Sequence, residues 1–588
     1  MLKTLGAQVK EFKKPSIIAA ACTLAEVALE ISLPLVTASI IDKGIEAGNL
    51  GNVFLYGFFM VLLAAASLTM GVMAGRFSAV ASTGFAKNLR EAMYKNIQTY
   101  SFANIDKFST SGLVTRMTTD VTNLQTSYQM LMRMCLRSPI TLICALFMSF
   151  TINAKVASVF LAAIVFLGVI LGIIVKIGMK SFHETFKRYD DLNASVQENV
   201  SAIRVVKAFV REDFEKEKFN KAANNVYKLF VKAEKIVGYN NPVMNLTVYG
   251  CMLAISWISA QMIVGGSMTT GNLTSLFTYC MNIMMSLMML SMIFVMMSMS
   301  IASAKRIAEV IKEEADIVSP ENALTTVRDG SVDFNHVYFS YDKKLRGEKN
   351  VLNDIDLHIK SGETIGIIGG TGCGKTSLVN LVSRLYDVTS GSVLVGGVDV
   401  RKYDLEALRN QVAVVLQKNE LFSGTILDNL RWGDEHATEE DCIRVCKMAC
   451  ADDFIQRMPD KYHTYIEQGG TNVSGGQKQR LCIARALLKK PKILILDDST
   501  SAVDTATDAR IRKAFRDEIP NTTKFIIAQR ISSIQDADRI IVLEGGRVNG
   551  FGTHEELLET NEIYRSVYEG QTLGGGDFDE PKEEKGGE

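Results

Sequence analysis

The chain has 588 residues, more than a single hydrophobic core usually supports, so at least two domains are expected. Hydrophobic residues make up 47% of it, and its 64 Lys and Arg residues equal its 64 Asp and Glu residues. This composition is typical of a membrane-embedded part joined to a soluble part. It argues against nucleic acid as a partner, because binding to a phosphate backbone depends on a basic excess.

Six apolar stretches in the first half are long enough to cross a bilayer, which takes about 20 predominantly apolar residues. They cover residues 15–41, 53–73, 138–154, 156–175, 242–265 and 273–302. The first stretch is too long for a cleavable signal peptide, and no small-residue cleavage site follows it. We therefore expect an all-α membrane domain with six spanning helices over residues 1–312.

Two long, charged segments, 74–137 and 176–241, separate spans two and three and spans four and five. If each is a helical hairpin with arms of roughly 30 residues, the arms extend about 45 Å beyond the bilayer. Lys and Arg residues precede span one and occur throughout the first long segment, whereas the links 44–51 and 266–271 contain none. The positive-inside rule therefore predicts that both termini and both arms are cytoplasmic.

Two carboxylates, Glu26 and Glu30, lie inside the first span, one helical turn apart on one face. A carboxylate within a membrane is costly and by default indicates a functional site that faces a cavity or a partner helix. The alternative interpretation is that these residues approach a water-filled vestibule and are simply tolerated there.

Methionine dominates the last span. Flexible, polarizable side chains of this kind can repack around different hydrophobic cargoes, although they suit ordinary helix and lipid contacts equally well. The residues concerned are Met281, Met284, Met285, Met288, Met289, Met292, Met296, Met297 and Met299.

After residue 312 the apolar runs shorten, which predicts a linker at 313–330 and an α/β domain at 331–570. The tail, residues 571–588, is glycine-rich and acidic, and we expect it to be disordered. Within the α/β domain Cys442, Cys446 and Cys450 recur every four residues. We interpret them as one buried helix face, because a zinc site needs four ligands and no nearby histidine completes it.

A phosphate-binding loop follows a short buried strand at residues 364–368. The loop matches G-x-x-x-x-G-K-[ST] and precedes a helical pattern, as the motif requires. Glycines let backbone N–H groups point at phosphate oxygens, Lys375 neutralises the β and γ phosphates, and Thr376 ligates Mg²⁺. The predicted loop comprises Gly369, Gly370, Thr371, Gly372, Cys373, Gly374, Lys375, Thr376 and Ser377.

A second apolar strand, residues 493–496, ends in Asp497 and Asp498. The carboxyl edge of a parallel sheet is where ligands bind in such folds, so these carboxylates are expected beside the phosphates. Asp497 would hold Mg²⁺ through its hydration shell. The soluble half is therefore predicted to be an α/β P-loop domain that binds ATP or GTP with Mg²⁺.

Between these two strands, Val473-Ser-Gly-Gly-Gln resembles LSGGQ, the signature motif of ATP-binding cassette proteins. With six spans before one cassette, the chain resembles a half-transporter of the type IV ABC exporter family, which contains multidrug, lipid and peptide exporters. The resemblance implies that Tyr341 stacks on adenine and that Gln417 links the nucleotide and its metal to the membrane helices. It further implies that Asp504 lies in a loop crossing the cassette dimer, and that 103–112 and 209–215 are coupling helices.

In this family two cassettes close head to tail, so ATP lies between the phosphate loop of one and the signature motif of the other. The signature residues here are Ser474, Gly475, Gly476 and Gln477. One cassette therefore offers two half-sites, and a second half-transporter must complete the protein.

The chain departs from the family pattern at two catalytic positions. Asp498 replaces the usual glutamate, and a displacement of about 1 Å can cost roughly 10²-fold in rate. Gln529 replaces the usual histidine and can donate a hydrogen bond, but it carries no proton to transfer and no positive charge. The resemblance is therefore to the degenerate-site subunit of a heterodimeric exporter.

From these features we expect an integral protein of a bacterial plasma membrane that exports hydrophobic or amphipathic small molecules with ATP and Mg²⁺. Two alternatives stay open. One is export of a lipid or a peptide, although no protease domain precedes the first span. The other is a membrane sensor in which ATP acts as a switch and nothing is transported.

Overall fold

The computed structural model describes residues 1–341, 350–498 and 503–573 and divides into two compact units. The first unit comprises Met1–Thr99 and Phe108–Glu313. The second comprises Tyr100–Lys107 together with the described chain from Glu314 onward. A short segment from the first half of the sequence thus belongs to the same unit as the soluble domain.

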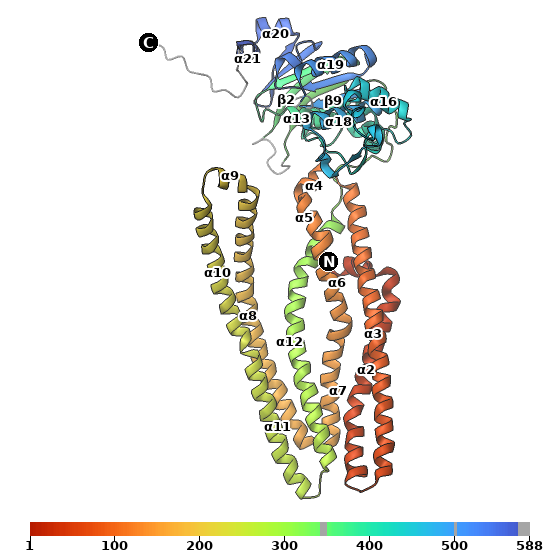
Figure 1. Ribbon diagram of the computed structural model, residues 1–588, viewed down its shortest axis with the longest axis vertical. Helices are drawn as coiled ribbons and strands as arrows, with labels where there is room; N and C mark the ends of the chain where they lie inside the picture. Colours follow the sequence, from red (N-terminus) through yellow and green to blue (C-terminus); the bar gives the residue numbers. More distant parts are fainter. Residues whose placement is uncertain (342–349, 499–502, 574–588) are drawn as a thin grey trace. The chain divides into compact units, whose positions relative to one another are not determined.

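The first unit is built from helices alone in its described part (Figure 1). They are α1 Leu2–Ala7, α2 Lys13–Ile40, α3 Leu50–Thr99, α5 Thr110–Thr115, α6 Val121–Met130, α7 Leu136–Ile152, α8 Ala154–Ser201, α9 Ile203–Ala208, α10 Glu212–Gly238, α11 Asn240–Val264 and α12 Thr270–Lys312. Single π-helical turns, η3 (Arg116–Asp120) and η4 (Leu131–Cys135), join α5 to α6 and α6 to α7.

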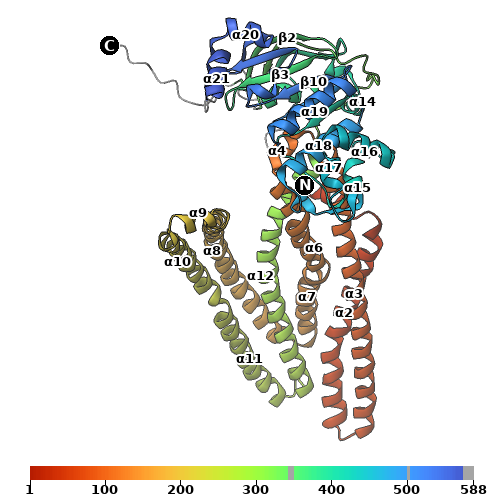
Figure 2. The same ribbon diagram turned by 45° about the horizontal axis from the view of Figure 1, so that its top comes forward.

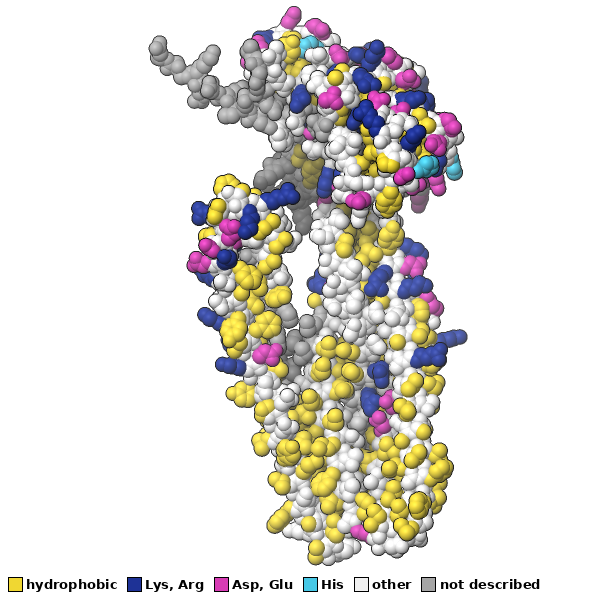
Figure 3. All heavy atoms as spheres, viewed as in Figure 1, with side chains coloured by type: hydrophobic (Ala, Val, Ile, Leu, Met, Phe, Trp, Pro, Cys, Tyr) yellow, Lys and Arg dark blue, Asp and Glu magenta, His cyan; other side chains and the backbone are white. Residues whose placement is uncertain are grey.

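Within the described residues, six helical runs are long and apolar enough to cross a membrane, which confirms the predicted six-helix domain. They are Lys10–Ile45, Leu50–Thr99, Thr110–Ile152, Ala154–Gly178, Glu212–Val264 and Thr270–Ile293. Figure 3 shows hydrophobic side chains gathered over the ends of these helices that lie away from the charged arms. The core between them is formed by buried residues of α2, α7, α8, α11 and α12.

The arms are continuations of the spanning helices. Figures 1 and 2 show α10 running beside α8, and the two helices contact each other. The predicted coupling helix at 209–215 is wrong in detail. The chain forms the short helix α9 first, turns at Val210 with a φ of 51°, and begins α10 only at Glu212. A positive φ at a β-branched residue is incompatible with a continuous helix there.

The second unit confirms the predicted α/β domain. A six-stranded sheet has the order β12-β11-β3-β10-β9-β6, and a four-stranded antiparallel sheet has the order β2-β1-β4-β5. The strands are β1 Val332–Phe339, β2 Leu352–Ile359, β3 Thr364–Gly369, β4 Ser390–Val395, β5 Val398–Asp399, β6 Val412–Val415, β7 Gly424–Thr425, β8 Tyr465–Ile466, β9 Ile493–Asp497, β10 Thr523–Ile527, β11 Arg539–Glu544 and β12 Arg547–Gly552.

Helices surround these sheets, and two large clusters of buried apolar residues fill the spaces between them. The helices are α4 Phe102–Phe108, α13 Lys375–Val382, α14 Leu405–Gln411, α15 Ile426–Leu430, α16 Glu439–Met448, α17 Asp452–Ile455, α18 Gly475–Leu488, α19 Thr505–Glu518, α20 His554–Thr560 and α21 Glu562–Leu573. The last helix continues past the predicted domain end at residue 570. Most of the predicted tail, residues 574–588, lies outside the described residues.

All three cysteines are buried, as predicted, but only two of them share a helix. Cys442 and Cys446 are fully enclosed in α16, and Cys450 lies 6% exposed just beyond it. Burial raises the pKa of Cys446, which keeps the thiol protonated. Among the described residues no group of three His, Cys, Asp or Glu side chains is placed to hold a metal ion.

Candidate functional site

The candidate nucleotide site forms where three parallel strands end together. Strand β10 pairs in parallel with β3 on one side and β9 on the other, with Ile527 opposite both Ile367 and Asp497. Residues that follow β3, β9 and β10 therefore reach the same edge of the sheet. This edge is the usual ligand position in parallel α/β sheets.

Two glycines of the predicted loop are required by space and by conformation. A Cβ at Gly369 would lie 2.2 Å from the Leu543 carbonyl oxygen, and Gly374 has a φ of 100° with a Cβ position 2.8 Å from Leu352 Cδ2. Gly374 is the N-cap residue directly before α13. Any other residue at these positions would push the loop out of shape, because real Cβ atoms do not approach so closely.

Lys375 and Thr376 lie where the motif predicts. The Lys375 Nζ donates to the carbonyl oxygens of Gly369 at 2.6 Å and Gly370 at 2.9 Å, so it lies over the loop. The Thr376 hydroxyl donates to both carboxylate oxygens of Asp497, at 3.1 and 2.9 Å. A hydroxyl and a carboxylate from separate elements therefore meet at the helix N-terminus, and both are oxygen ligands of the kind that Mg²⁺ prefers.

These groups line a cavity of about 350 Å³. Its lining residues are Tyr341, Val351, Thr371, Gly372, Gly374, Lys375, Thr376, Ser377, Gln417, Asp497, Asp498, Ile527 and Gln529. Of the predicted loop, Gly369, Gly370 and Cys373 are not among the lining residues. The structure thus brings together residues from six separate segments, and all of these except the one at Val351 contain residues that the sequence had linked only through motifs.

The two departures from the family pattern touch each other. The Gln529 Nε2 donates to Asp498 Oδ2 at 3.0 Å, and the Asp498 backbone has a φ of 48° in the left-handed region. Aspartate tolerates that region better than most residues. One oxygen of this carboxylate is therefore occupied by an amide donor.

Burial raises the pKa of Asp497, and the nearby charge of Asp498 raises it further. Burial also raises the pKa of Asp498, against the opposing effects of a hydrogen bond with Gln417 and the charge of Lys375. Two carboxylates beside one lysine make this edge a place where a bound cation is favourable.

The raised pKa of Asp498 gives a stability prediction. A carboxyl whose folded pKa lies above its unfolded value stabilises the fold only at low pH, and this contribution is lost as the pH rises through the folded pKa. At pH 7.5 and without nucleotide, Asp498→Asn should raise the melting temperature by about 1–2 °C. The gain should vanish near pH 4, about the unfolded pKa. Differential scanning fluorimetry of the full chain checks this, with the exposed Asp517→Asn as control. An equal gain at both pH values would contradict it.

The predicted signature residues lie apart from this cavity. Ser474 precedes α18, where its hydroxyl accepts from the Gln477 N–H at 3.3 Å and its own N–H donates to Gln477 Oε1 at 2.9 Å. Gly475 and Gly476 form the first positions of the helix. Asp504 similarly caps α19 by accepting from the Thr507 N–H at 2.9 Å, and its predecessors 499–502 lie outside the described residues.

Tyr341 lies at the rim of the cavity with its side chain 49% exposed. Its hydroxyl shares a hydrogen bond with Ser377 Oγ at 2.8 Å, and its ring lies 5.1 Å from that of Tyr386. Tyr386 in turn donates to Asp106 Oδ2 at 2.7 Å and lies 6.1 Å from the ring of Phe102. Asp106, in the first predicted coupling segment 103–112, thus contacts an aromatic cluster that reaches the cavity. This segment is not one helix, because α4 ends at Phe108 and Ser109 has a φ of 56° before α5 begins.

Sequence patterns gave no sign of a contact from the last helix. The Gln571 Nε2 donates to the Gln529 carbonyl oxygen at 3.0 Å, and its Oε1 accepts from the Ile531 N–H at 2.9 Å. An amide on α21 therefore fixes the backbone on both sides of Arg530, directly after Gln529. No local motif marks such a long-range contact.

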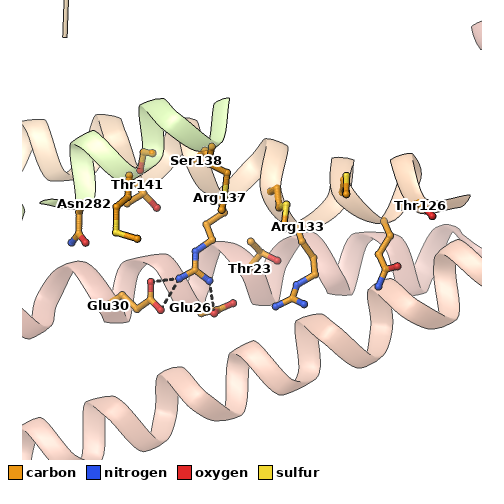
Figure 4. Close-up of a pocket in the computed structure, with 15 residues that line it drawn as sticks. Thr23, Glu26, Glu30, Thr126, Arg133, Arg137, Ser138, Thr141 and Asn282 are labelled. Carbon is orange, nitrogen blue, oxygen red and sulfur yellow. Dashed lines mark hydrogen bonds and ion pairs between the residues drawn. The ribbon is translucent and has the colours of Figure 1, made fainter. Parts of the chain in front are cut away.

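The helical unit contains a second polar site, a cavity of about 450 Å³ (Figure 4). Glu26 and Glu30 both line it and share one partner, Arg137. The Arg137 Nη1 donates to Glu26 at 2.7 Å, and its Nη2 donates to both oxygens of Glu30 at 2.8 and 2.7 Å. The two carboxylates thus face a cavity, and each forms an ion pair with Arg137.

Helices that span a membrane joined to a P-loop domain with this strand order define a membrane transport ATPase. The family described as "ABC transporter transmembrane region" matches residues 16–288, and the family "ABC transporter" matches residues 352–501. The chain belongs to the ABC transporter family, as an exporter half-transporter that is an integral membrane protein with an ATP-binding domain.

Individual relatives are similar in sequence to this chain over nearly its whole length. The Bacillus subtilis "Uncharacterized ABC transporter ATP-binding protein YfiB" is 35% identical over 94% of this chain and 96% of its own length. The "ATP-dependent lipid A-core flippase" of Desulfotalea psychrophila is 30% identical over 97% and 99%. A solved "bacterial Atm1-family ABC exporter with ATP bound" has the same fold, with a TM-score of 0.82 at 24% identity over 95% of this chain and 99% of that one.

Proposed function

We propose that the chain is one subunit of a heterodimeric exporter, which uses ATP to move hydrophobic or amphipathic small molecules and in which this chain contributes the degenerate ATP site. The observation that carries this proposal is the hydrogen bond from Gln529 to Asp498. A shortened carboxylate held by a neutral amide is a poor base for the attacking water, because its free lone pairs are reduced and no proton carrier lies beside it.

We assign nucleotide binding to the phosphate loop and Tyr341, which line one cavity. Backbone N–H groups of the loop and Lys375 would hold the phosphates, and the Tyr341 ring would stack on adenine. Thr376, Asp497 and Gln417 would hold Mg²⁺, since they supply a hydroxyl, a carboxylate and an amide oxygen at the same edge. Bound there, Mg²⁺ supplies charge neutralisation for the phosphates.

Asp498 and Gln529 occupy the catalytic positions of this site, and each is a less effective catalytic group than the glutamate or histidine usual in the family. Asp498 would orient the attacking water, and Gln529 would donate one hydrogen bond to the γ-phosphate. Neither side chain supplies positive charge to the transition state. Binding is therefore retained at this site while hydrolysis is slow.

The signature residues serve the other site. Ser474 and the helix N-terminus of α18 lie outside this chain's own cavity, so they would act on a nucleotide held by a second half-transporter. Asp504 would lie in the loop that crosses between the two cassettes. The competent site is then built from the partner's phosphate loop and this chain's unaltered signature motif.

We place the protein in a bacterial plasma membrane with both termini cytoplasmic, as the distribution of Lys and Arg favours. The assignment gives residues 1–312 to the membrane domain, 313–330 to the linker and 331–570 to the cassette, followed by the tail 571–588. Export of a lipid is the second candidate, because relatives at 30% and 33% identity are named lipid A-core flippases.

Transport into inverted membrane vesicles tests the function. The chain co-expressed with a candidate partner should accumulate a hydrophobic dye only when ATP is present. Stimulation of ATPase by the same dye supports export. Nucleotide-dependent binding of another protein without any flux would instead support a membrane sensor.

Restoring only one of the two residues usual in the family should recover only part of the ATP turnover at this chain's site. In the heterodimer, Asp498→Glu alone should raise turnover at this chain's site by about 10-fold or less, and Asp498→Glu combined with Gln529→His should raise it by about 100-fold. The partner's own catalytic carboxylate is removed in this assay so that only this chain's site reports. Full recovery by the single change would show that Gln529 is not limiting.

A further inference from the structure

The cavity of the helical unit is lined by four ionisable side chains, two acidic and two basic, namely Glu26, Glu30, Arg133 and Arg137. Three of them form one ion-paired group around Arg137, in which two carboxylates share a single guanidinium. This group carries one net negative charge. Arg133 carries one positive charge, so the lining as a whole is neutral.

Arg133 has no such partner. Across the part of the chain that the structure describes, no carboxylate lies within 4.0 Å of its guanidinium, and no hydrogen bond to it is formed. Figure 4 shows Arg133 and Arg137 extending from the same helical run toward the helix that carries Glu26 and Glu30. Arg133 lies in the π turn η4, and π turns shift the direction of side chains and occur often at functional sites.

Two hydroxyls of the same cavity also lack partners in the described structure. Ser138 is 2% exposed, and its Oγ makes no hydrogen bond; the same holds for the buried Oγ1 of Thr141. Burying a polar group without a partner is costly. These hydroxyls and Arg133 are therefore groups that a polar ligand would satisfy.

The carboxylates of Glu26 and Glu30 differ in solvent exposure. The Glu26 side chain is 10% exposed and lies against α3, where a Cβ at Gly71 would come within 3.0 Å of Glu26 Oε1. The Glu30 side chain is 35% exposed. Glu30 is thus the more accessible of the two carboxylates, and both of its oxygens also accept from Arg137.

An apolar surface adjoins these charges. Met130, Met134, Met285 and Met289 line the same cavity. Their thioether side chains are flexible and adapt to varied apolar groups. Met285 is 67% exposed, so part of this surface is open to a ligand.

We propose that this cavity binds an amphiphile with a zwitterionic headgroup, whose anionic group pairs with Arg133, whose cationic amine pairs with Glu30, and whose apolar part lies on the methionines. A neutral lining favours such a headgroup, because a ligand with a net charge would leave one charge uncompensated at low dielectric constant. This inference rests on the proposed export function in that it takes the cavity as the place where cargo binds.

Binding of amphiphiles with matched hydrocarbon chains tests the headgroup. The full chain with its partner is held in a neutral maltoside detergent, and dissociation constants are measured by microscale thermophoresis for four amphiphiles with the same monounsaturated chain length. These are lysophosphatidylethanolamine, lysophosphatidic acid, monooleoylglycerol and oleylamine. The zwitterion should bind about 10-fold more tightly than the other three, the difference that one charged hydrogen bond contributes. Equal or tighter binding of any of them would overturn the proposal.

Two substitutions assign the contacts. Arg133→Met should weaken binding of lysophosphatidylethanolamine by about 10-fold and leave monooleoylglycerol unchanged. Glu30→Gln should remove the preference of the site for the zwitterion over lysophosphatidic acid. Arg76→Met, at an exposed position of α3 outside the cavity, is the matched control. Equal effects of Arg133→Met and Arg76→Met would refute the assignment.

Vesicle transport separates this inference from the export function. If the zwitterion binds with the stated preference but no amphiphile is carried with ATP, the export function fails and the binding site stands. If amphiphiles are carried with no preference for the zwitterion, the headgroup inference fails and export stands.

Discussion

Replacing Ser474 by alanine should lower the ATPase rate of the heterodimer by about 100-fold. Removing one donor that stabilises developing charge typically costs 10²–10³-fold. In the proposed arrangement this hydroxyl faces the partner's nucleotide, where nearly all hydrolysis takes place. The rate should fall with little change in the affinity of this chain's own cavity for ATP. Steady-state ATPase of the purified heterodimer measures it.

A structural explanation must be excluded, because Ser474 also caps α18. Thr438 caps α16 with the same reciprocal pair of hydrogen bonds, between its side chain and the Asp441 N–H and between its N–H and the Asp441 carboxylate. Loss of such a cap costs about 1 kcal/mol of stability wherever it occurs. Thr438→Ala should therefore lower stability similarly and leave the ATPase rate unchanged. A comparable loss of rate in both variants would mean that Ser474 acts only as a cap.

Replacing Lys375 by alanine should have the opposite effect: nucleotide affinity at this chain's site should fall, while the ATPase rate of the heterodimer should change little. The lysine lies over the loop of this chain's cavity, where a charge-assisted contact contributes about 10- to 100-fold in affinity. Nucleotide binding at this site should weaken by that factor, whereas ATPase of the heterodimer should fall by less than about 3-fold. Photolabelling with 8-azido-ATP followed by separation of the two subunits reports the site-specific affinity.

The exposed Lys360 provides the control for this experiment. Lys360→Ala removes an equal charge from the cassette at a position outside the cavity and should change neither quantity. If Lys375→Ala abolished all turnover, the two sites would not divide binding and hydrolysis in the way proposed.

The predicted phosphate loop and strand ends agree with the structure because local sequence encodes them. Glycine spacing, a short apolar strand and the following helix fix the loop, and an apolar run ending in Asp497 fixes the neighbouring strand. Once β3, β9 and β10 pair in parallel, their ends must meet. The six spanning helices could also be predicted from the sequence, because their length and hydropathy are local properties.

Contacts between distant segments could not be predicted in this way. Arg137 lies at the start of an apolar run, yet its pairing with Glu26 and Glu30 depends on how separate helices pack. The hydrogen bond between Gln529 and Asp498, and the two hydrogen bonds of Gln571 with the backbone around Arg530, likewise depend on tertiary geometry. The predicted helix at 209–215 was wrong because no glycine or proline marks the turn at Val210.

The most direct test of the account is the ATPase rate of this chain purified alone, compared under the same conditions with the chain co-purified with a second half-transporter. With Asp498 and Gln529 at the catalytic positions, the isolated chain should hydrolyse ATP about 100-fold more slowly than the pair while still binding the nucleotide. A stable dimer of this chain alone that turns over ATP as fast as the pair would contradict the proposed division between a binding site and a hydrolysing site.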